Sequence, residues 1–276
     1  MSIDNNPLKQ YFRRPAIYLK LPSGGKDYKP GVLDMPDSGE LPVFPMTAID
    51  EITSKTPDAL FNGVAVVEVI KSCIPAILDP WSISNVDLDA VLIAIKSASN
   101  GNELEIDSEC PKCKEVSKFG VNLVGLLSSL KAGDYSQELP VNDLLIKFRP
   151  LTYKEVNQAS LSQFDLQRMF NVINAMEDYD EKNEKTKEAL KAITDITMTI
   201  LSLTIEYIKT PNSFVDSNEY ILDYLRNCDK NVYEKIKVHN ATLKEQTEIK
   251  PLQIKCISCS YEYQQPFSLN SSDFFG

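Results

Sequence analysis

The spacing of apolar residues predicts several amphipathic helices. From Val66 to Cys73 the apolar positions lie three or four residues apart, and Pro75 ends the pattern. The segment from Leu88 to Ile95 repeats this spacing and is followed by Asn100-Gly101, a pair typical of a helix C-terminus. A longer apolar stripe runs from Phe164 to Met176. Each segment is expected to bury one face in a helical core.

The middle of the chain is predicted to be a helical layer. Thr152, with Glu155 three positions later, is typical of a helix start and opens the stripe that ends at Met176. The charged run from Glu177 to Glu188 indicates a solvated loop or a frayed helix end. Leu190 to Ile208 is strongly apolar and is expected to return as a second helix. Residues 140 to 240 are therefore expected to be a helical insertion.

Alternating apolar and polar positions predict short strands elsewhere. Ile17, Leu19 and Leu21 alternate with polar side chains inside a segment, residues 1 to 46, that is rich in proline and glycine. We expect this segment to be an extended N-terminal arm. Residues 102 to 130 also have strand character, around the first of two Cys-x-x-Cys motifs.

These patterns predict an α+β fold that is mainly helical. We expect an extended arm at residues 1–46 and a helical core with a first cysteine hairpin at 47–139. The helical insertion at 140–240 precedes a second cysteine hairpin and tail at 241–276. The two hairpins together are expected to form a zinc-ribbon-like pair joined across the insertion.

The four paired cysteines are the strongest chemical signal in the sequence. Cys110 and Cys113 form one Cys-x-x-Cys pair, and Cys256 and Cys259 form the other. Tetrahedral zinc needs four ligands, so two such pairs complete one closed structural site. A thiol oxidoreductase is the alternative, but neither pair precedes an obvious helix of a βαβ unit. With 142 residues between Cys113 and Cys256, the ion is expected to tie the last segment back to the first third.

The distribution of charge disfavours nucleic acid and favours a protein as the binding partner. The chain has 276 residues and a formal net charge of −10, which disfavours nucleic acid as a ligand. Residues 1 to 30 carry six basic residues against Asp4 and Asp27, a local balance of +4 that favours docking of the arm onto an acidic protein surface. We expect no membrane contact, because the apolar stretch at Ile193 to Ile208 is too short for a bilayer. The start shows no secretory signal.

No catalytic constellation is evident. Ser23 to Lys26 resembles part of a phosphate-binding loop but lacks the full motif, and a turn is expected. His239 is expected to be exposed rather than a general base. Asp87 and Asp89 are explained by the preference for acidic residues in the first turn of a helix. We therefore expect no enzyme activity and no small-molecule substrate.

Several strings in the first half resemble a known family. They are Asn6–Ser23, Leu41–Asp50, Lys55–Gly63, Asp79–Trp81 and Asp87–Ile95. These strings resemble baseplate hub or hub-assembly proteins of T-even-type bacteriophages with contractile tails. The second half is similar mainly through its terminal cysteine pair.

The resemblance implies a structural or assembly component of the tail baseplate that acts through contacts with other tail or baseplate proteins. It implies a place in the virion tail, after assembly in the host cytoplasm. One alternative is a hub-assembly chaperone that is absent from the mature particle. Another is a zinc-ribbon module that binds nucleic acid or regulates a partner.

Overall fold

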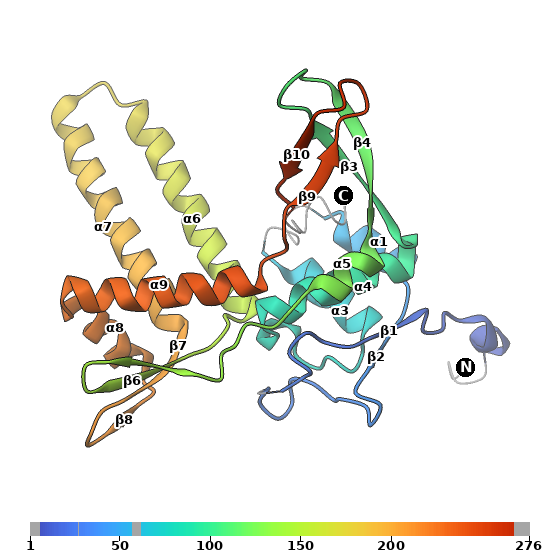
Figure 1. Cartoon of the computed structure of the whole chain (residues 1–276), viewed down its shortest axis with the longest axis horizontal. Coiled ribbons are helices and arrows are strands. Elements are labelled where there is room, and N and C mark those ends of the chain that lie inside the picture. The colour runs from blue at the N-terminus through green and yellow to red at the C-terminus, as the bar shows by residue number, and fades with distance from the viewer. Residues whose placement is uncertain (1–5, 27, 57–61, 268–276) are drawn as a thin grey trace. The chain divides into compact units, whose positions relative to one another are not determined.

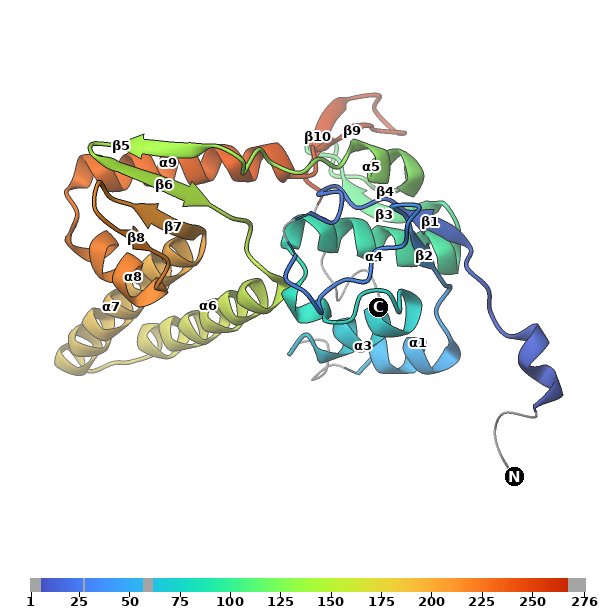
Figure 2. The ribbon, with the colours of Figure 1, turned by 90° about the horizontal axis from the view of Figure 1, so that it is seen from below.

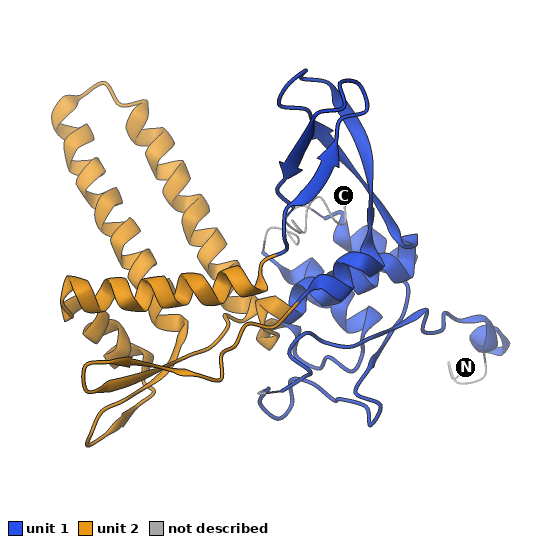
Figure 3. Cartoon of the chain, in the orientation of Figure 1, with its two compact units in different colours: residues 1–80, 87–130, 249–276 blue, residues 81–86, 131–248 orange. Residues whose placement is uncertain are grey.

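The structure, a computed structural model, describes residues 6–26, 28–56 and 62–267. It confirms an α+β chain with helices and small antiparallel sheets. The chain divides into two compact units, which Figure 3 distinguishes by colour. Unit 1 contains residues 1–80, 87–130 and 249–276, and unit 2 contains residues 81–86 and 131–248. Each unit is described by itself below.

Unit 1 contains the helices that the apolar spacing predicted in the first third of the chain. The α-helices among its described residues are α1 (Ala48–Ser54), α3 (Val64–Cys73), α4 (Asn85–Asn100, from residue 87 onward) and α5 (Leu123–Ser129). Thr47 and Asp50 form the capping box of α1, in which each side chain accepts from the other residue's backbone N–H. The helix α5, which begins directly after a strand, was not predicted from the sequence.

Within its described residues, unit 1 also contains three two-stranded antiparallel sheets (Figures 1 and 2). The pairs are β1 (Ile17–Leu19) with β2 (Leu41–Val43), β3 (Glu103–Glu109) with β4 (Val116–Asn122), and β9 (Leu252–Lys255) with β10 (Glu262–Gln265). A 3-10 turn, η2 (Pro7–Tyr11), precedes β1, and η3 (Pro80–Ser82) lies where the two units meet in sequence. The strand character predicted for residues 102 to 130 is thus confirmed for β3 and β4 but is wrong for residues 123–129, which form α5.

The segment predicted as an extended N-terminal arm at residues 1–46 is largely part of unit 1, because Leu19, Leu41 and Val43 are buried there. Arg13 holds the beginning of this segment. The Arg13 guanidinium donates to the backbone oxygen of Pro45, to Ser72 O at 2.8 Å and to Asp50 Oδ2 at 3.3 Å. Asp50 is only 7% exposed and also accepts from Thr47 and Ser72. A buried carboxylate with these donors stabilises the junction between segments far apart in sequence.

A second buried carboxylate holds the turn at Ser23. Asp87, which is fully buried, accepts hydrogen bonds from Ser23 N at 2.9 Å and from the Tyr28 hydroxyl at 2.6 Å. The Ser23 hydroxyl donates to the same carboxylate. The segment around Ser23 is therefore a turn, as expected, rather than a phosphate-binding loop.

The sequence interpretation of the neighbouring aspartates was only half right. Asp87 lies in the first turn of α4, but Asp89 lies beyond it. Desolvation raises the pKa of Asp89 to about 6, because burial disfavours the carboxylate.

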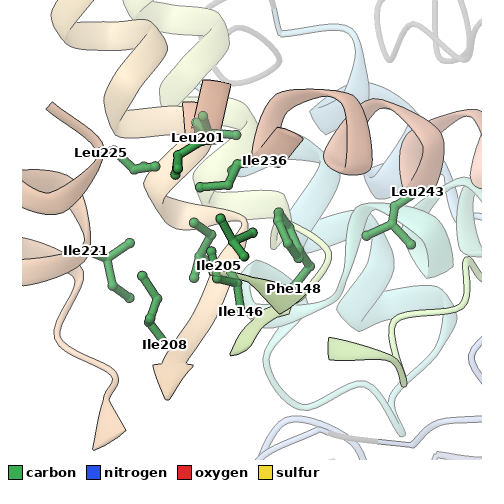
Figure 4. Close-up of a cluster of buried hydrophobic side chains, with 11 residues drawn as sticks. Ile146, Phe148, Leu201, Ile205, Ile208, Ile221, Leu225, Ile236 and Leu243 are labelled. Atoms are coloured by element: carbon green, nitrogen blue, oxygen red, sulfur yellow. The ribbon is translucent and has the colours of Figure 1, made fainter. Parts of the chain in front are cut away.

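Unit 2 is built on a four-stranded antiparallel sheet, whereas the sequence predicted a helical insertion with one short strand at Leu144, Ile146 and Phe148. Its order is β5-β6-β7-β8, and the strands are β5 (Glu138–Val141), β6 (Leu144–Phe148), β7 (Ile205–Lys209) and β8 (Phe214–Val215). The helices α8 (Asn218–Asn227) and α9 (Lys230–Thr247) follow β8 in the chain. Figure 4 shows side chains of β6, β7, α8 and α9 meeting in one apolar core, which includes Phe148, Ile205, Ile221 and Ile236.

A long helical hairpin completes unit 2. It consists of α6 (Tyr153–Asn174) and α7 (Tyr179–Leu203), which run antiparallel (Figure 1). The charged run at Glu177 to Glu188 is mostly helix, contrary to the prediction of a loop or frayed end. Asp178 caps α7 by accepting from Glu181 N, and Lys185 pairs with Glu188 at 2.9 Å within the helix.

The predicted return helix from Leu190 to Ile208 ends earlier than expected. After α7 the chain turns into β7, where Ile205 and Ile208 are buried and Glu206 is exposed. Apolar spacing alone cannot separate a helix end from a short buried strand. Residues 205–209 form a strand because β7 pairs with both β6 and β8.

Candidate metal centre

Two β-hairpins position the four predicted cysteine ligands in unit 1. Cys110 follows β3 and Cys113 precedes β4, while Cys256 follows β9 and Cys259 precedes β10. Figure 1 shows the two hairpins side by side, although they are far apart in sequence. The sequence prediction that all four cysteines meet at one place agrees with this geometry.

The sulfur atoms are spaced as one metal ion requires. All four Sγ atoms lie within 4.8 Å of one another, with Cys110 and Cys259 3.7 Å apart and Cys113 and Cys256 3.6 Å apart. Zinc with Zn–S bonds of about 2.3 Å places its sulfurs about 3.8 Å apart in a tetrahedron. A disulfide needs only about 2.05 Å between sulfurs, so these are free thiols. The arrangement can hold a metal ion.

The two cysteine turns share one backbone geometry. Cys110 N donates to Glu115 O and Cys256 N donates to Tyr261 O, both at 2.9 Å. The residues that follow the second cysteines, Lys114 and Ser260, have positive φ values of 61° and 58°. Such values are unusual for residues other than glycine, so the same strained turn occurs twice. Each turn directs its two thiols to the same side.

Burial and charge differ between the thiols. Cys110 and Cys256 are buried, whereas Cys113 is exposed and Cys259 is intermediate. Desolvation raises the pKa of Cys110, but hydrogen bonds from the backbone N–H groups of Cys113 and Lys112 outweigh it and lower the pKa to about 7. The backbone N–H of Glu115 lowers the pKa of Cys113, yet desolvation and the three neighbouring sulfurs raise it to about 12. Four thiolates therefore need a cation in order to coexist.

Polar side chains that the sequence analysis missed join the hairpins below the sulfurs. Ser108 of β3 is buried and contacts the Tyr263 hydroxyl at 2.8 Å and Gln265 Oε1 at 2.9 Å, both on β10. The sequence signal was a serine at an inward position of an alternating strand, but its partners lie more than 150 residues away. These contacts fix the orientation of one hairpin against the other.

An apolar cluster supports the hairpins from below. It contains Ile93, Val121, Leu123 and Leu126, with partly buried residues from the last segment packed against it: Ile249, Leu252 and Phe267. The end of the described chain is thus held to the first third of the sequence by apolar packing as well as by the cysteine cluster.

The remaining candidate residues lie apart from the cysteine cluster. His239 of α9 is half-buried, with its ring 4.9 Å from the ring of Phe148, so the expectation of an exposed histidine was wrong. Burial lowers the pKa of His239. Cys73 is buried at the end of α3, where desolvation raises its pKa to about 11, and Cys228 packs beside the unit 2 core.

Comparisons with known proteins identify the family. No helix within the described residues is long and apolar enough to cross a membrane. No curated protein and no solved structure matches the chain. The family model described as T4 bacteriophage base plate protein matches residues 15–276, which is nearly the whole sequence. The chain therefore belongs to the T4 bacteriophage base plate protein family.

Proposed function

We propose that the protein is a structural or assembly component of the hub region of a contractile phage baseplate. The family match over residues 15–276 carries this proposal, because it supports a baseplate role, contacts with other tail proteins and a place in the virion tail. The assignment to the hub rests on the resemblance of the N-terminal strings. The protein acts by binding partners and catalyses no reaction.

A structural zinc ion held by Cys110, Cys113, Cys256 and Cys259 stabilises the protein in this proposal. Sulfur separations close to the edge of a zinc tetrahedron support it. Four protein ligands close the coordination shell, so zinc contributes stability rather than an open position for water or substrate. When bound, the ion joins the hairpin β3–β4 to the hairpin β9–β10.

The N-terminal arm is the proposed contact surface for partners. It has a local excess of positive charge, and several of its large apolar side chains are exposed. Exposed aromatic and basic side chains are enriched among the residues that dominate protein interfaces.

Metal analysis tests the zinc site. We expect about one zinc per chain in the wild type. The Cys256→Ser variant should lose the zinc, because only three thiolates remain. Cys228→Ser is the matched control, since this thiol lies outside the cluster. Zinc that survives in Cys256→Ser would contradict ligation shared by the two hairpins.

Particle composition distinguishes a permanent subunit from an assembly factor. Quantitative mass spectrometry of purified mature particles should find the chain at a fixed ratio to other tail proteins. Presence in assembly intermediates and absence from mature particles would instead identify the chaperone alternative. Steeply salt-dependent binding to DNA or RNA would contradict both roles and favour the nucleic-acid module.

A further inference from the structure

The beginning of the described chain exposes an unusual group of side chains. Leu8, Tyr11 and Phe12 are 60%, 76% and 56% exposed, and the cations Lys9 and Arg14 lie among them. The 3-10 turn η2 contains no buried residue. We call residues 6–14 the basic tip. Figures 1 and 2 both show η2 extending away from the helices of unit 1.

The basic tip is attached to unit 1 at a defined point, and its charged side chains are all positive. Arg13 holds its base to Ser72 and Asp50, so the tip projects from a defined point of unit 1. The sequence has no acidic residue between Asp4 and Asp27. A segment held in place at one end loses less conformational entropy when it binds, which favours docking.

The outer face of α8 in unit 2 has the complementary chemistry. Ile221 and Leu225 of α8 point into the apolar core (Figure 4), so the opposite side of this helix faces outward. That side, with the residues just before it, exposes three carboxylates and two aromatic rings. We call this set the acidic face: Phe214, Asp216, Glu219, Tyr220 and Asp223.

Other acidic surfaces match the tip less well. The sequence from Phe214 to Leu225 contains no lysine or arginine, and Phe214 and Tyr220 are 56% and 67% exposed. The acidic row on β3 is partly neutralised, because Lys118 pairs with Glu105. The acidic run at 177–188 is interspersed with three lysines. The acidic face thus combines uncompensated charge with exposed aromatic surface.

We propose that the basic tip of one copy binds the acidic face of a second copy. Lys9 and Arg14 lie about 14 Å apart along the backbone. Asp216 precedes α8, and the backbone from Asp216 to Asp223 also covers at most about 14 Å, so the charges on the two surfaces have a similar spacing. Such a tip buries on the order of 1,000 Å² in total, so the contact is weak and reversible. Because the two surfaces differ, the contact is head-to-tail and builds rings or open chains.

Charge reversal in matched pairs tests the contact. The tip variant is Lys9→Glu with Arg14→Glu, and the face variant is Asp216→Lys with Asp223→Lys. A control variant, Glu103→Lys with Asp107→Lys, changes the net charge by the same amount as the face variant on the exposed side of β3. Sedimentation velocity of the full chain over a concentration series measures self-association, and circular dichroism checks that each variant is folded.

The wild type and the β3 control should associate as concentration rises and dissociate in high salt. The tip and face variants should each associate about 100-fold more weakly, because attraction becomes repulsion. An equimolar mixture of the two variants should regain association, since the reversed tip then meets the reversed face. A monomeric wild type at all concentrations, or a mixture that fails to associate, would overturn the proposal.

This inference rests on the arm being a contact surface, and particle assembly separates the two ideas. If the wild type is monomeric but the tip variant is not incorporated into baseplates, self-association is wrong and the arm binds another protein. If the tip variant is incorporated normally, the proposed role of the arm is itself wrong.

Discussion

The two units achieve stability by different means. Unit 1 joins three separate stretches of sequence, and unit 2 is formed almost entirely by residues 131–248. Among the described residues, the buried carboxylates Asp50 and Asp87 both belong to unit 1. The large core cluster of unit 2 is apolar throughout. Both units bury apolar side chains, but the unit assembled from distant segments adds buried carboxylate contacts and a cysteine cluster to its apolar core.

A capping box that also binds an arginine occurs in both units and shows how their contacts differ in sequence separation. Each unit has a capping box whose carboxylate also binds an arginine. In unit 1 Asp50 pairs with Arg13, 37 positions away, and in unit 2 Glu155 pairs with Arg149, six positions away. The first pair fastens separate segments together. The second only reinforces a local turn at the start of α6.

Loss of the proposed zinc site should have the largest effect on stability, and the destabilisation should be confined to unit 1. Structural zinc contributes on the order of 10 kcal/mol, comparable with the whole stability of a domain. Cys256→Ser should therefore open the hairpins β3–β4 and β9–β10. Hydrogen exchange of the intact protein should show faster exchange in both hairpins and unchanged protection in β6 and β7.

Cys228→Ser serves again as the control and should preserve the exchange pattern. If Cys256→Ser accelerated exchange equally in both units, the division into separately stabilised units would be wrong.

A cavity in the apolar core of unit 2 should destabilise unit 2 and leave unit 1 intact. Phe148 is 1% exposed within the unit 2 cluster, and replacing a buried phenylalanine by alanine costs about 3–5 kcal/mol. Phe148→Ala should lower the denaturant midpoint of unit 2, and the zinc content should stay unchanged. Zinc release at the same denaturant concentration as the unfolding of unit 2 would show that the units unfold together.

The sequence predicted the local parts of the fold better than the sheet. The helix start at Thr152 and the helices α3 and α4 depend on neighbouring residues, so short-range patterns reveal them. The sheet of unit 2 depends on β6 pairing with β7, some 60 residues later. No short-range pattern contains that pairing, and the apolar run from Leu190 to Ile208, which includes most of β7, was therefore interpreted as one helix.

The candidate site was predictable because its chemistry is regular. Two Cys-x-x-Cys pairs indicate four converging ligands without knowledge of the fold. The contacts of Ser108 with Tyr263 and Gln265 had no such signal, since serine, tyrosine and glutamine occur in many strands. Their pairing follows only from the placement of the two hairpins.

Removal of the contact between Arg13 and Asp50 should have an intermediate effect on the free energy of unfolding. Arg13→Ala deprives Asp50 and Ser72 of a donor and is expected to cost about 2 kcal/mol. It should also free the base of the arm, so limited proteolysis should cleave faster near Arg14. Arg149→Ala is the matched comparison and should cost about 1 kcal/mol without changing cleavage of the arm. Equal proteolysis of both variants would indicate that Arg13 does not hold the arm.

The smallest expected effect on stability concerns Asp89, a partly buried carboxyl of unit 1, and depends on pH. Asp89 has an ordinary pKa of 3.8, which burial raises to about 6, so the folded state binds this proton more tightly than the unfolded state. The wild type therefore loses stability as pH rises from about 4 to about 6. Asp89→Asn removes that loss and should raise the free energy of unfolding by about 1–2 kcal/mol above pH 6, with no gain below pH 4. Thermal unfolding of both proteins at pH 4 and pH 7.5 measures the difference. Asp107→Asn, at an exposed position, should show no such pH dependence. A gain in stability for Asp89→Asn that persists at pH 4 would mean that titration of the Asp89 carboxyl is not its cause.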